Sequence, residues 1–198
     1  MPSIEIAIHD TRLSGSIYPR PRVSLLETAD HETLEQLTRR IAATARAAGG
    51  TVSDMRIYAH GVRPVGASGP GDGRQILLAQ ERVHRGNAGI FGLGLAGLIS
   101  GRIWLYVCAA AARPDGEATC LALAYGAGVP VVASRQIQDY STQSTSTTFG
   151  DYEIPGTASP DWINFGRWEG EVIVCHPDGR AEPWFTGPAP VSSRDVHI

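Results

Sequence analysis

Two short apolar segments of this chain each end at a side chain that could carry out nucleophilic chemistry. Met55 to Ala59 is followed by His60 and Gly61, and Ile103 to Val107 is followed by Cys108. A thiolate is a strong nucleophile, and an imidazole that titrates near neutral pH can accept and return its proton. If both segments are parallel strands of one sheet, their carboxyl ends share an edge, where open α/β folds place their sites. The sequence therefore predicts an imidazole and a thiol side by side.

The same two residues also have an ordinary structural interpretation. A histidine at a strand end is commonly a hydrogen-bonded structural residue, and a cysteine in an apolar run is commonly buried. Two local features favour the chemical interpretation. Gly61 supplies a backbone N–H with no side chain in the way, and Cys108 opens a run of four alanines, Ala109 to Ala112, which leaves space in front of the sulfur. We therefore take Cys108 and His60 as a candidate dyad.

The elements that must position this pair predict an α/β fold. Near the N-terminus, alternating isoleucines predict a strand from Ile4 to Asp10, and Val23 to Leu26 predicts a short second strand. A helix is expected next, with Asp30 as its N-terminal cap, apolar residues at helical spacing and Gly49-Gly50 at its end.

The centre of the chain predicts a parallel sheet. Ile103 to Val107 is apolar without alternation, as in a strand buried on both faces. Asp115 to Gly128 has helical spacing, and Val129 to Ala133 is a further buried strand. A strand, a helix and a strand at this spacing form a right-handed crossover and hence a parallel pair. Ile90 to Gly101 predicts a glycine-rich helix, and Gln75 to Gln80 predicts a strand that could be half of a hairpin.

The C-terminal part of the chain predicts a β-hairpin appendage that packs onto the sheet edge. Its strands are Trp162 to Trp168 and Glu171 to Val174, with a turn at Pro177-Asp178-Gly179 and a final apolar pair, Trp184-Phe185. Before it, Ser141 to Thr148 is almost wholly Ser and Thr, which predicts a mobile connector that could also act as a substrate flap.

The length of 198 residues favours one domain with one core. We expect this domain to span residues 1–187 as a mainly parallel sheet flanked by helices, with the β-hairpin appended, and residues 188–198 to form a frayed tail.

Composition excludes several classes of function. The formal net charge of −3 gives no reason to expect nucleic acid or an anionic membrane as a partner. All 17 basic residues are arginine, so the lysine chemistry of P-loop proteins, protein kinases and pyridoxal enzymes is absent.

Cofactor and metal motifs are weak. The segment from Gly92 to Gly97 matches GxGxxG, but no strand precedes it and no acidic residue stands about 20 positions on, so a small-residue packing element is the better interpretation. The cysteines and histidines do not form the closely spaced pairs that zinc sites use; only Cys175-His176 comes close. A GxSxG serine nucleophile motif is also absent. We expect neither a metal nor a cofactor.

The chain also carries hints about its compartment. Its first ten residues read as a strand rather than as a secretory signal, and its longest apolar stretch, Ile90 to Ile99, is shorter than the roughly 20 residues that span a bilayer. Cys108, Cys120 and Cys175 are an odd number at unrelated spacings, so we expect reduced thiols. A cytoplasmic location is the expectation.

An apolar strand ending in His-Gly, followed 48 residues later (108 − 60) by an apolar strand ending in Cys, resembles the caspase–haemoglobinase class of cysteine peptidases. This class includes caspases, metacaspases, clostripain, gingipain and separase, and similar segments occur in uncharacterised bacterial domains of the same superfold. The resemblance covers roughly residues 50 to 135, including the strand before Ser134. It implies a caspase-like topology for the sheet.

The resemblance also implies a role for each residue. Cys108 would be the nucleophile, His60 the general acid and base, and the N–H of Gly61, with that of Cys108, would form the oxyanion hole. Thiolate attack on an amide, stabilisation of the oxyanion by backbone donors and protonation of the leaving amine by imidazole form a coherent sequence of steps.

The chain departs from its relatives where they select substrates. Caspases have Gln-Ala-Cys, whereas this chain has Tyr106-Val107-Cys108, and metacaspases have an acidic residue at the position of Tyr106. Asp115 and Glu117 could form an acidic pocket, but acids in the first turn of a helix are also favoured by its dipole.

The sequence therefore predicts a peptidase with a peptide or protein substrate, and it leaves open a catalytically silent binding or regulatory module on the same scaffold. The oligomeric state is not predicted.

Overall fold

The computed structural model describes residues 4–17, 21–62, 75–112, 114–138, 168 and 170–187, together with four short strand segments between residues 141 and 164. Its centre is a seven-stranded sheet with the strand order β2-β1-β3-β7-β8-β13-β14. The strands are β1 (Ile4–Asp10), β2 (Val23–Thr28), β3 (Val52–Tyr58), β7 (Ile103–Tyr106), β8 (Val131–Ser134), β13 (Glu171–Cys175) and β14 (Ala181–Thr186). The first five strands in this order, β2, β1, β3, β7 and β8, run parallel to one another. The α/β class and the mainly parallel sheet are confirmed.

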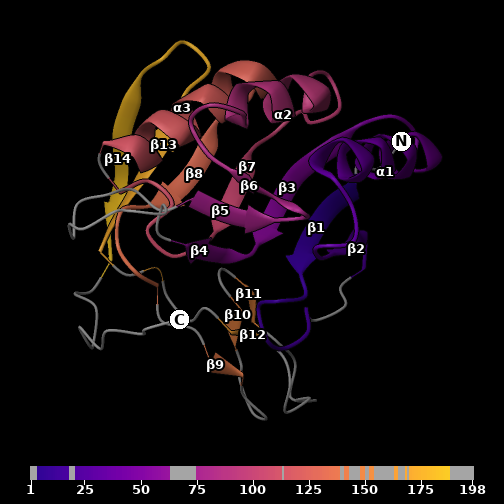
Figure 1. The fold of residues 1–198 in the computed structure, drawn as a ribbon, viewed down its shortest axis with the longest axis horizontal. Helices are drawn as coiled ribbons and strands as arrows, with labels where there is room; N and C mark the ends of the chain where they lie inside the picture. The colour runs from indigo at the N-terminus through magenta and orange to yellow at the C-terminus, as the bar shows by residue number, and fades with distance from the viewer. Residues whose placement is uncertain are drawn as a thin grey trace.

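Three helices pack on one face of this sheet (Figure 1). They are α1 (Leu34–Ala47), α2 (Ala88–Leu95) and α3 (Asp115–Ala127). The apolar side chains of all three join a single core with the strand residues that point toward them, such as Ile57 and Leu105. Among the described residues, the opposite face carries a separate core without helical members, built around Tyr58, Tyr106 and Trp168. The described helices therefore cover one face, whereas the sequence predicted helices flanking the sheet.

The start of α1 differs from the prediction. Thr33, not Asp30, is the N-terminal cap, because its side chain accepts a hydrogen bond from the backbone N–H of Gln36 and the Gln36 side chain accepts one from the Thr33 backbone. This reciprocal pair is a capping box, which satisfies two otherwise unpaired N–H groups. Asp30 and Thr33 are both residue types that cap helices, and Gln36, three positions after Thr33, favours Thr33 because it completes the capping box.

Glycines let α2 and α3 pack against each other backbone to backbone. A Cβ atom at Gly92 would lie 2.5 Å from the carbonyl oxygen of Leu123, and one at Gly126 would lie 2.2 Å from that of Gly89. No side chain fits at either distance. The GxGxxG segment is therefore a packing element, as expected, although the partner of α2 here is a helix rather than a strand.

The last two strands belong to the main sheet rather than to an appendage. β13 is antiparallel to β8, and β14 is antiparallel to β13 across the turn at Pro177 to Gly179. The predicted first strand of the hairpin, Trp162 to Trp168, lies largely outside the described residues, as do the Ser/Thr-rich segment and the tail 188–198.

Smaller sheets complete the described structure. β4 (His60–Val62), β5 (Gln75–Leu78) and β6 (Glu81–Val83) form a three-stranded antiparallel sheet. β9 (Ser141–Thr142) pairs with β12 (Ile163–Asn164), and β10 (Thr148–Phe149) pairs with β11 (Tyr152–Glu153). Within the described residues, none of the helices is both long and apolar enough to cross a membrane.

Candidate active site

The strands that precede His60 and Cys108 are parallel neighbours in the main sheet. β3 and β7 are in register, with Tyr58 opposite Tyr106. His60 and Cys108 each follow two positions later, so the register brings them to matching positions at the carboxyl edge. The Ala59 N–H donates to the Tyr106 carbonyl at 3.5 Å, and the chain then continues as β4, which belongs to a different sheet.

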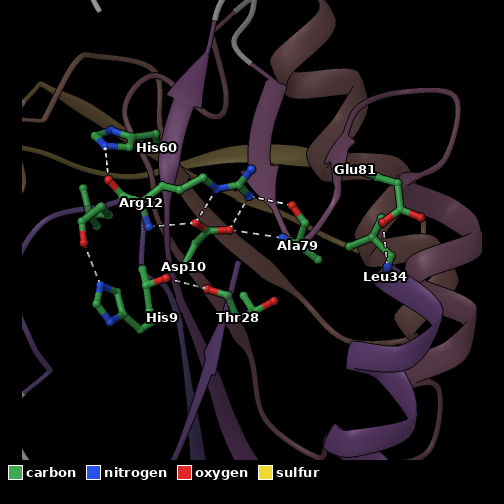
Figure 2. Close-up of polar contacts among 10 residues, drawn as sticks. His9, Asp10, Arg12, Thr28, Leu34, His60, Ala79 and Glu81 are labelled. Atoms are coloured by element: carbon green, nitrogen blue, oxygen red, sulfur yellow. Dashed lines mark hydrogen bonds and ion pairs between the residues drawn. The ribbon is translucent and has the colours of Figure 1, made fainter. Parts of the chain in front are cut away.

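The ring of His60 is held from the side of β1. Its Nε2 lies 3.2 Å from the carbonyl oxygen of Arg12, in the loop that follows β1 (Figure 2). A carbonyl oxygen can only accept, so Nε2 carries the proton in this contact. In the neutral ring Nδ1 then carries the lone pair, which is the nitrogen able to act as a base.

The thiol of Cys108 is held from the side of β8. Its Sγ lies 3.3 Å from the carbonyl oxygen of Gln138, to which the S–H donates. Gln138 is itself buried, and its side-chain amide donates to the hydroxyl of Ser134 at 2.7 Å. A thiolate could not donate to a carbonyl, so this contact stabilises the protonated form of Cys108.

The residue after Cys108 adopts a strained backbone conformation. Ala109 has φ of 51°, in the left-handed region that residues with a Cβ avoid. Its N–H donates to the carbonyl of Gln136 at 2.8 Å, and the N–H of Ala111 donates to that of Ser134 at 2.9 Å, so the loop after β7 is tied to the end of β8. Strain of this kind often marks functional loops and persists only where the surroundings enforce it.

The alanines after Cys108 serve packing. Ala110 and Ala111 are buried in the helix-side core, and a Cβ atom at Gly116 of α3 would lie 2.5 Å from the Ala110 carbonyl oxygen. The open space predicted in front of the sulfur stays a prediction. These small side chains allow the first turn of α3 to approach the loop backbone.

Gly61, the predicted oxyanion donor, lies in β4 opposite Ile76 of β5. Val62 ends this strand, and residues 63–74 lie outside the described residues. The oxyanion role of the Gly61 N–H stays a prediction.

Stacked aromatic rings lie on the face of the sheet opposite the helices, and two of them come two residues before His60 and Cys108. The ring centroids of Tyr58 and Tyr106 are 4.7 Å apart and those of Tyr106 and Trp168 are 4.8 Å apart. The Tyr106 hydroxyl accepts a hydrogen bond from the buried guanidinium of Arg56 at 2.7 Å. The position that is acidic in metacaspases is thus a buried ring inside a packed layer.

The acidic residues of α3 do not form a free acidic pocket. Glu117 pairs with Arg135 at 2.6 Å, so its charge is compensated, while Asp115 is exposed in the first turn. The helix-terminus interpretation of these acids is the one that fits their surroundings.

Sequence reasoning missed a buried carboxylate at the same edge. Asp10 ends β1 and is 1% exposed, and its two oxygens accept from the backbone and the guanidinium of Arg12 and from the backbone N–H of Ala79 (Figure 2). The hydrogen bond and charge of Asp10 raise the pKa of Arg12, against the opposing effect of burial. A run of polar residues directly after the strand that neighbours the histidine strand was the signal that could have identified it.

The other two cysteines are unsuited to nucleophilic chemistry. None of the three cysteines forms a disulfide, and Cys120 and Cys175 are fully buried. The hydrogen bond with Cys175 and burial raise the pKa of Cys120 well above its ordinary value, so this thiol stays protonated at neutral pH.

Among the described residues, no group of three His, Cys, Asp or Glu side chains is arranged to hold a metal ion. No family model, curated protein or solved structure matches the chain.

Proposed function

We propose that this chain is a caspase-like cysteine peptidase in which Cys108 attacks the carbonyl of a peptide bond and His60 transfers the protons. The observation that carries the proposal is the register of β3 and β7, which brings the two strand ends to matching positions on one edge. Parallel sheets commonly place their sites at this edge.

The chemistry can be written with the groups that are present. Nδ1 of His60 takes the thiol proton, and the thiolate of Cys108 attacks the substrate carbonyl to give a tetrahedral oxyanion. Backbone N–H groups, of which Gly61 is the candidate, stabilise that oxyanion. The imidazolium then protonates the leaving amine, and water hydrolyses the thioester with His60 as base.

The resting contact of the thiol must break before this reaction can begin. Because the S–H of Cys108 donates to the Gln138 carbonyl, this hydrogen bond has to break before the thiol can give its proton to His60. The proposal therefore requires that substrate binding, or a movement of the segment after β8, releases this contact.

That same contact favours the second candidate function, a binding or regulatory module without turnover. A thiol held in its protonated form by a carbonyl is a poor nucleophile, and the position where relatives select their substrate is filled by the buried Tyr106 ring. Both features suit a scaffold that has kept its fold without its activity.

An electrophilic peptide probe, compared with iodoacetamide, separates the two candidates. If the chain is a peptidase, the peptide electrophile labels Cys108 much faster than iodoacetamide does, Cys108→Ala abolishes labelling, and His60→Gln slows it by about 10²- to 10⁴-fold. Cys120→Ala is the matched control, because this thiol is buried, and it should label like the wild type.

Equal rates for the two reagents, together with no effect of His60→Gln, would favour the binding module. Cleavage of a peptide library, compared between the wild type and Cys108→Ala, then identifies the side chain that is recognised. Turnover should fall to the uncatalysed background in the variant, because losing the nucleophile of such a site costs on the order of 10⁶-fold in rate.

A further inference from the structure

We propose that Asp10 is a positioning residue for His60: its carboxylate fixes the Arg12 carbonyl that binds Nε2–H, and so selects the tautomer with its lone pair on Nδ1. This inference rests on the proposed function for its catalytic meaning. The structural claim about the tautomer can be tested without any activity.

The Asp10 carboxylate first binds Arg12, in the turn after β1. One oxygen of Asp10 accepts from the Arg12 backbone N–H at 3.1 Å and from its Nε at 2.7 Å, and the other oxygen accepts from its terminal nitrogen at 2.5 Å. The carboxylate therefore fixes the peptide plane before Arg12 and its side chain together. The carbonyl that follows is the acceptor for His60.

Asp10 and Arg12 also contact Ala79, next to the β4-β5-β6 sheet that carries His60. Asp10 also accepts from the Ala79 N–H at 3.1 Å, and the Arg12 guanidinium donates to the Ala79 carbonyl at 2.5 Å. Ala79 follows β5, in which Leu77 is the partner of His60 in β4. The same carboxylate thus ties together the backbone that carries the imidazole and the backbone that orients it.

The turn at Ala79 is itself fixed to the rest of the fold. The neighbouring Gln80 N–H donates to the carbonyl of Glu32 at 2.7 Å, and the Glu81 carboxylate accepts from the Leu34 N–H at the start of α1 at 2.7 Å (Figure 2). Because this turn is held from three directions, a displacement of Asp10 transmits to Arg12 and His60 rather than being absorbed by the turn.

Burial makes the role of Asp10 specific to a carboxylate. The side chain is 1% exposed and all of the contacts above are with donors, so both oxygens must accept. In Asp10→Asn the NH₂ group would face either the backbone N–H and Nε of Arg12 or its terminal nitrogen and the Ala79 N–H, so a donor meets donors in both orientations. The variant keeps the shape of the side chain and removes one side of the clamp.

A histidine tautomer is visible by ¹⁵N NMR on the full-length protein labelled at histidine, with the His60 signals assigned by their loss in His60→Gln. In the wild type we expect His60 to carry its proton on Nε2. In Asp10→Asn we expect a mixture of tautomers and a labelling rate at Cys108 lower by about 10- to 100-fold, the scale of small misplacements.

Asp178→Asn is the matched control, because Asp178 makes the same local contact to the backbone of Arg180 at the surface, far along the chain. It should leave the His60 tautomer and the labelling rate at their wild-type values. Arg12→Lys is the second variant: it keeps a positive charge beside Asp10 but loses the forked contact, and it should give a smaller shift in the same direction.

Three outcomes would overturn the inference: a wild-type His60 protonated on Nδ1, a folded Asp10→Asn protein with unchanged tautomer, or an Arg12→Lys protein with unchanged tautomer if the first variant does not fold. Failure of the proposed function looks different. In that case the wild-type Cys108 is not labelled selectively, yet the tautomer still shifts in Asp10→Asn.

Discussion

Within the part of the chain that the structure describes, the short motif Asp-x-Arg occurs at two turns with opposite surroundings. Asp10 and Arg12 follow β1 at the carboxyl edge of the sheet, and Asp178 and Arg180 form the turn between β13 and β14. In both, the carboxylate accepts from the backbone N–H of the arginine two residues on, at 3.1 Å and 3.0 Å. The contact of the carboxylate with the backbone is therefore the same in both.

Burial and partners differ. The Asp10 side chain is 1% exposed and also binds Ala79, whereas that of Asp178 is 62% exposed, and its ion-pair distance to Arg180 is 3.6 Å. The guanidinium of Arg180 instead lies 2.8 Å from Glu182. A motif that serves only its own turn in one place joins three segments of the fold in the other. The role of Asp10 in joining these segments therefore comes from its tertiary partner, Ala79, and not from the motif itself.

The largest expected effect comes from removing each carboxylate. Asp10→Ala leaves the Arg12 charge and the buried Ala79 N–H without their acceptor, so we expect a loss of about 3 kcal/mol in the free energy of unfolding. Asp178→Ala should lower the denaturation midpoint only slightly, because exposed pairs contribute little. Urea denaturation of both variants measures the two losses in stability. Equal losses would contradict the expected difference between the two motifs.

A smaller change in stability is expected from substitutions at two left-handed residues, Gly179 within one motif and Ala79 in contact with the other. Gly179 has φ of 88° with nothing near its missing Cβ, and Ala79 has φ of 56°. Gly179→Ala should therefore cost about 1 kcal/mol from backbone strain alone. Ala79→Gly relieves similar strain but loses a buried methyl group, so its net gain should stay below about 1 kcal/mol.

Thermal or urea unfolding of these two variants gives both signs in one experiment. The comparison holds if Gly179→Ala is destabilised and Ala79→Gly is not. A marked loss in Ala79→Gly would mean that the methyl group, rather than the hydrogen bonds to Asp10, holds that turn.

The smallest expected effect is the change in stability at acidic pH that follows from the ionisation of Asp178. The Arg180 backbone N–H, with the positive charges of Arg180 and His176, lowers the pKa of Asp178, against a small opposing effect of burial. A carboxylate with a lowered folded pKa stabilises the fold above its unfolded pKa of about 3.9, and that contribution is lost as the pH falls through the folded pKa.

Asp178→Asn should therefore differ slightly from the wild type in denaturation midpoint at about pH 6, and the difference should disappear as the pH falls through the lowered folded pKa of Asp178. Midpoints measured across this range check the sign. A difference that grows as the pH falls would show that Asp178 does not stabilise the turn in its charged form.

Local patterns predicted most of the elements of this fold. The alternating isoleucines of β1, the uniformly apolar run of β7 and the glycine after α3 are signals that act within one segment, and the structure has a strand, a strand and a helix end at these places. The parallel placement of β7 and β8 followed from the rule for a strand, a helix and a strand, and that of β3 and β7 was the starting hypothesis, which their pairing confirms.

What the sequence could not show depends on contacts between distant segments. The carbonyl groups of Arg12 and Gln138 hold the two candidate catalytic side chains, and every residue has a carbonyl, so no residue type marks them. Asp10 and Ala79 are 69 residues apart in the chain. The buried state of Tyr106 likewise depends on Trp168, which no local pattern connects to it.

The glycine contacts of α2 and α3 have a consequence for sequence divergence. At Gly92, Gly116 and Gly126 the neighbouring atoms are backbone, so no second substitution nearby can create room for a side chain. Homologues that lose Cys108 or His60 could still fold, but homologues that lose these glycines would need to move a helix. We expect descendants of this chain to keep glycine at these three positions longer than they keep the candidate dyad.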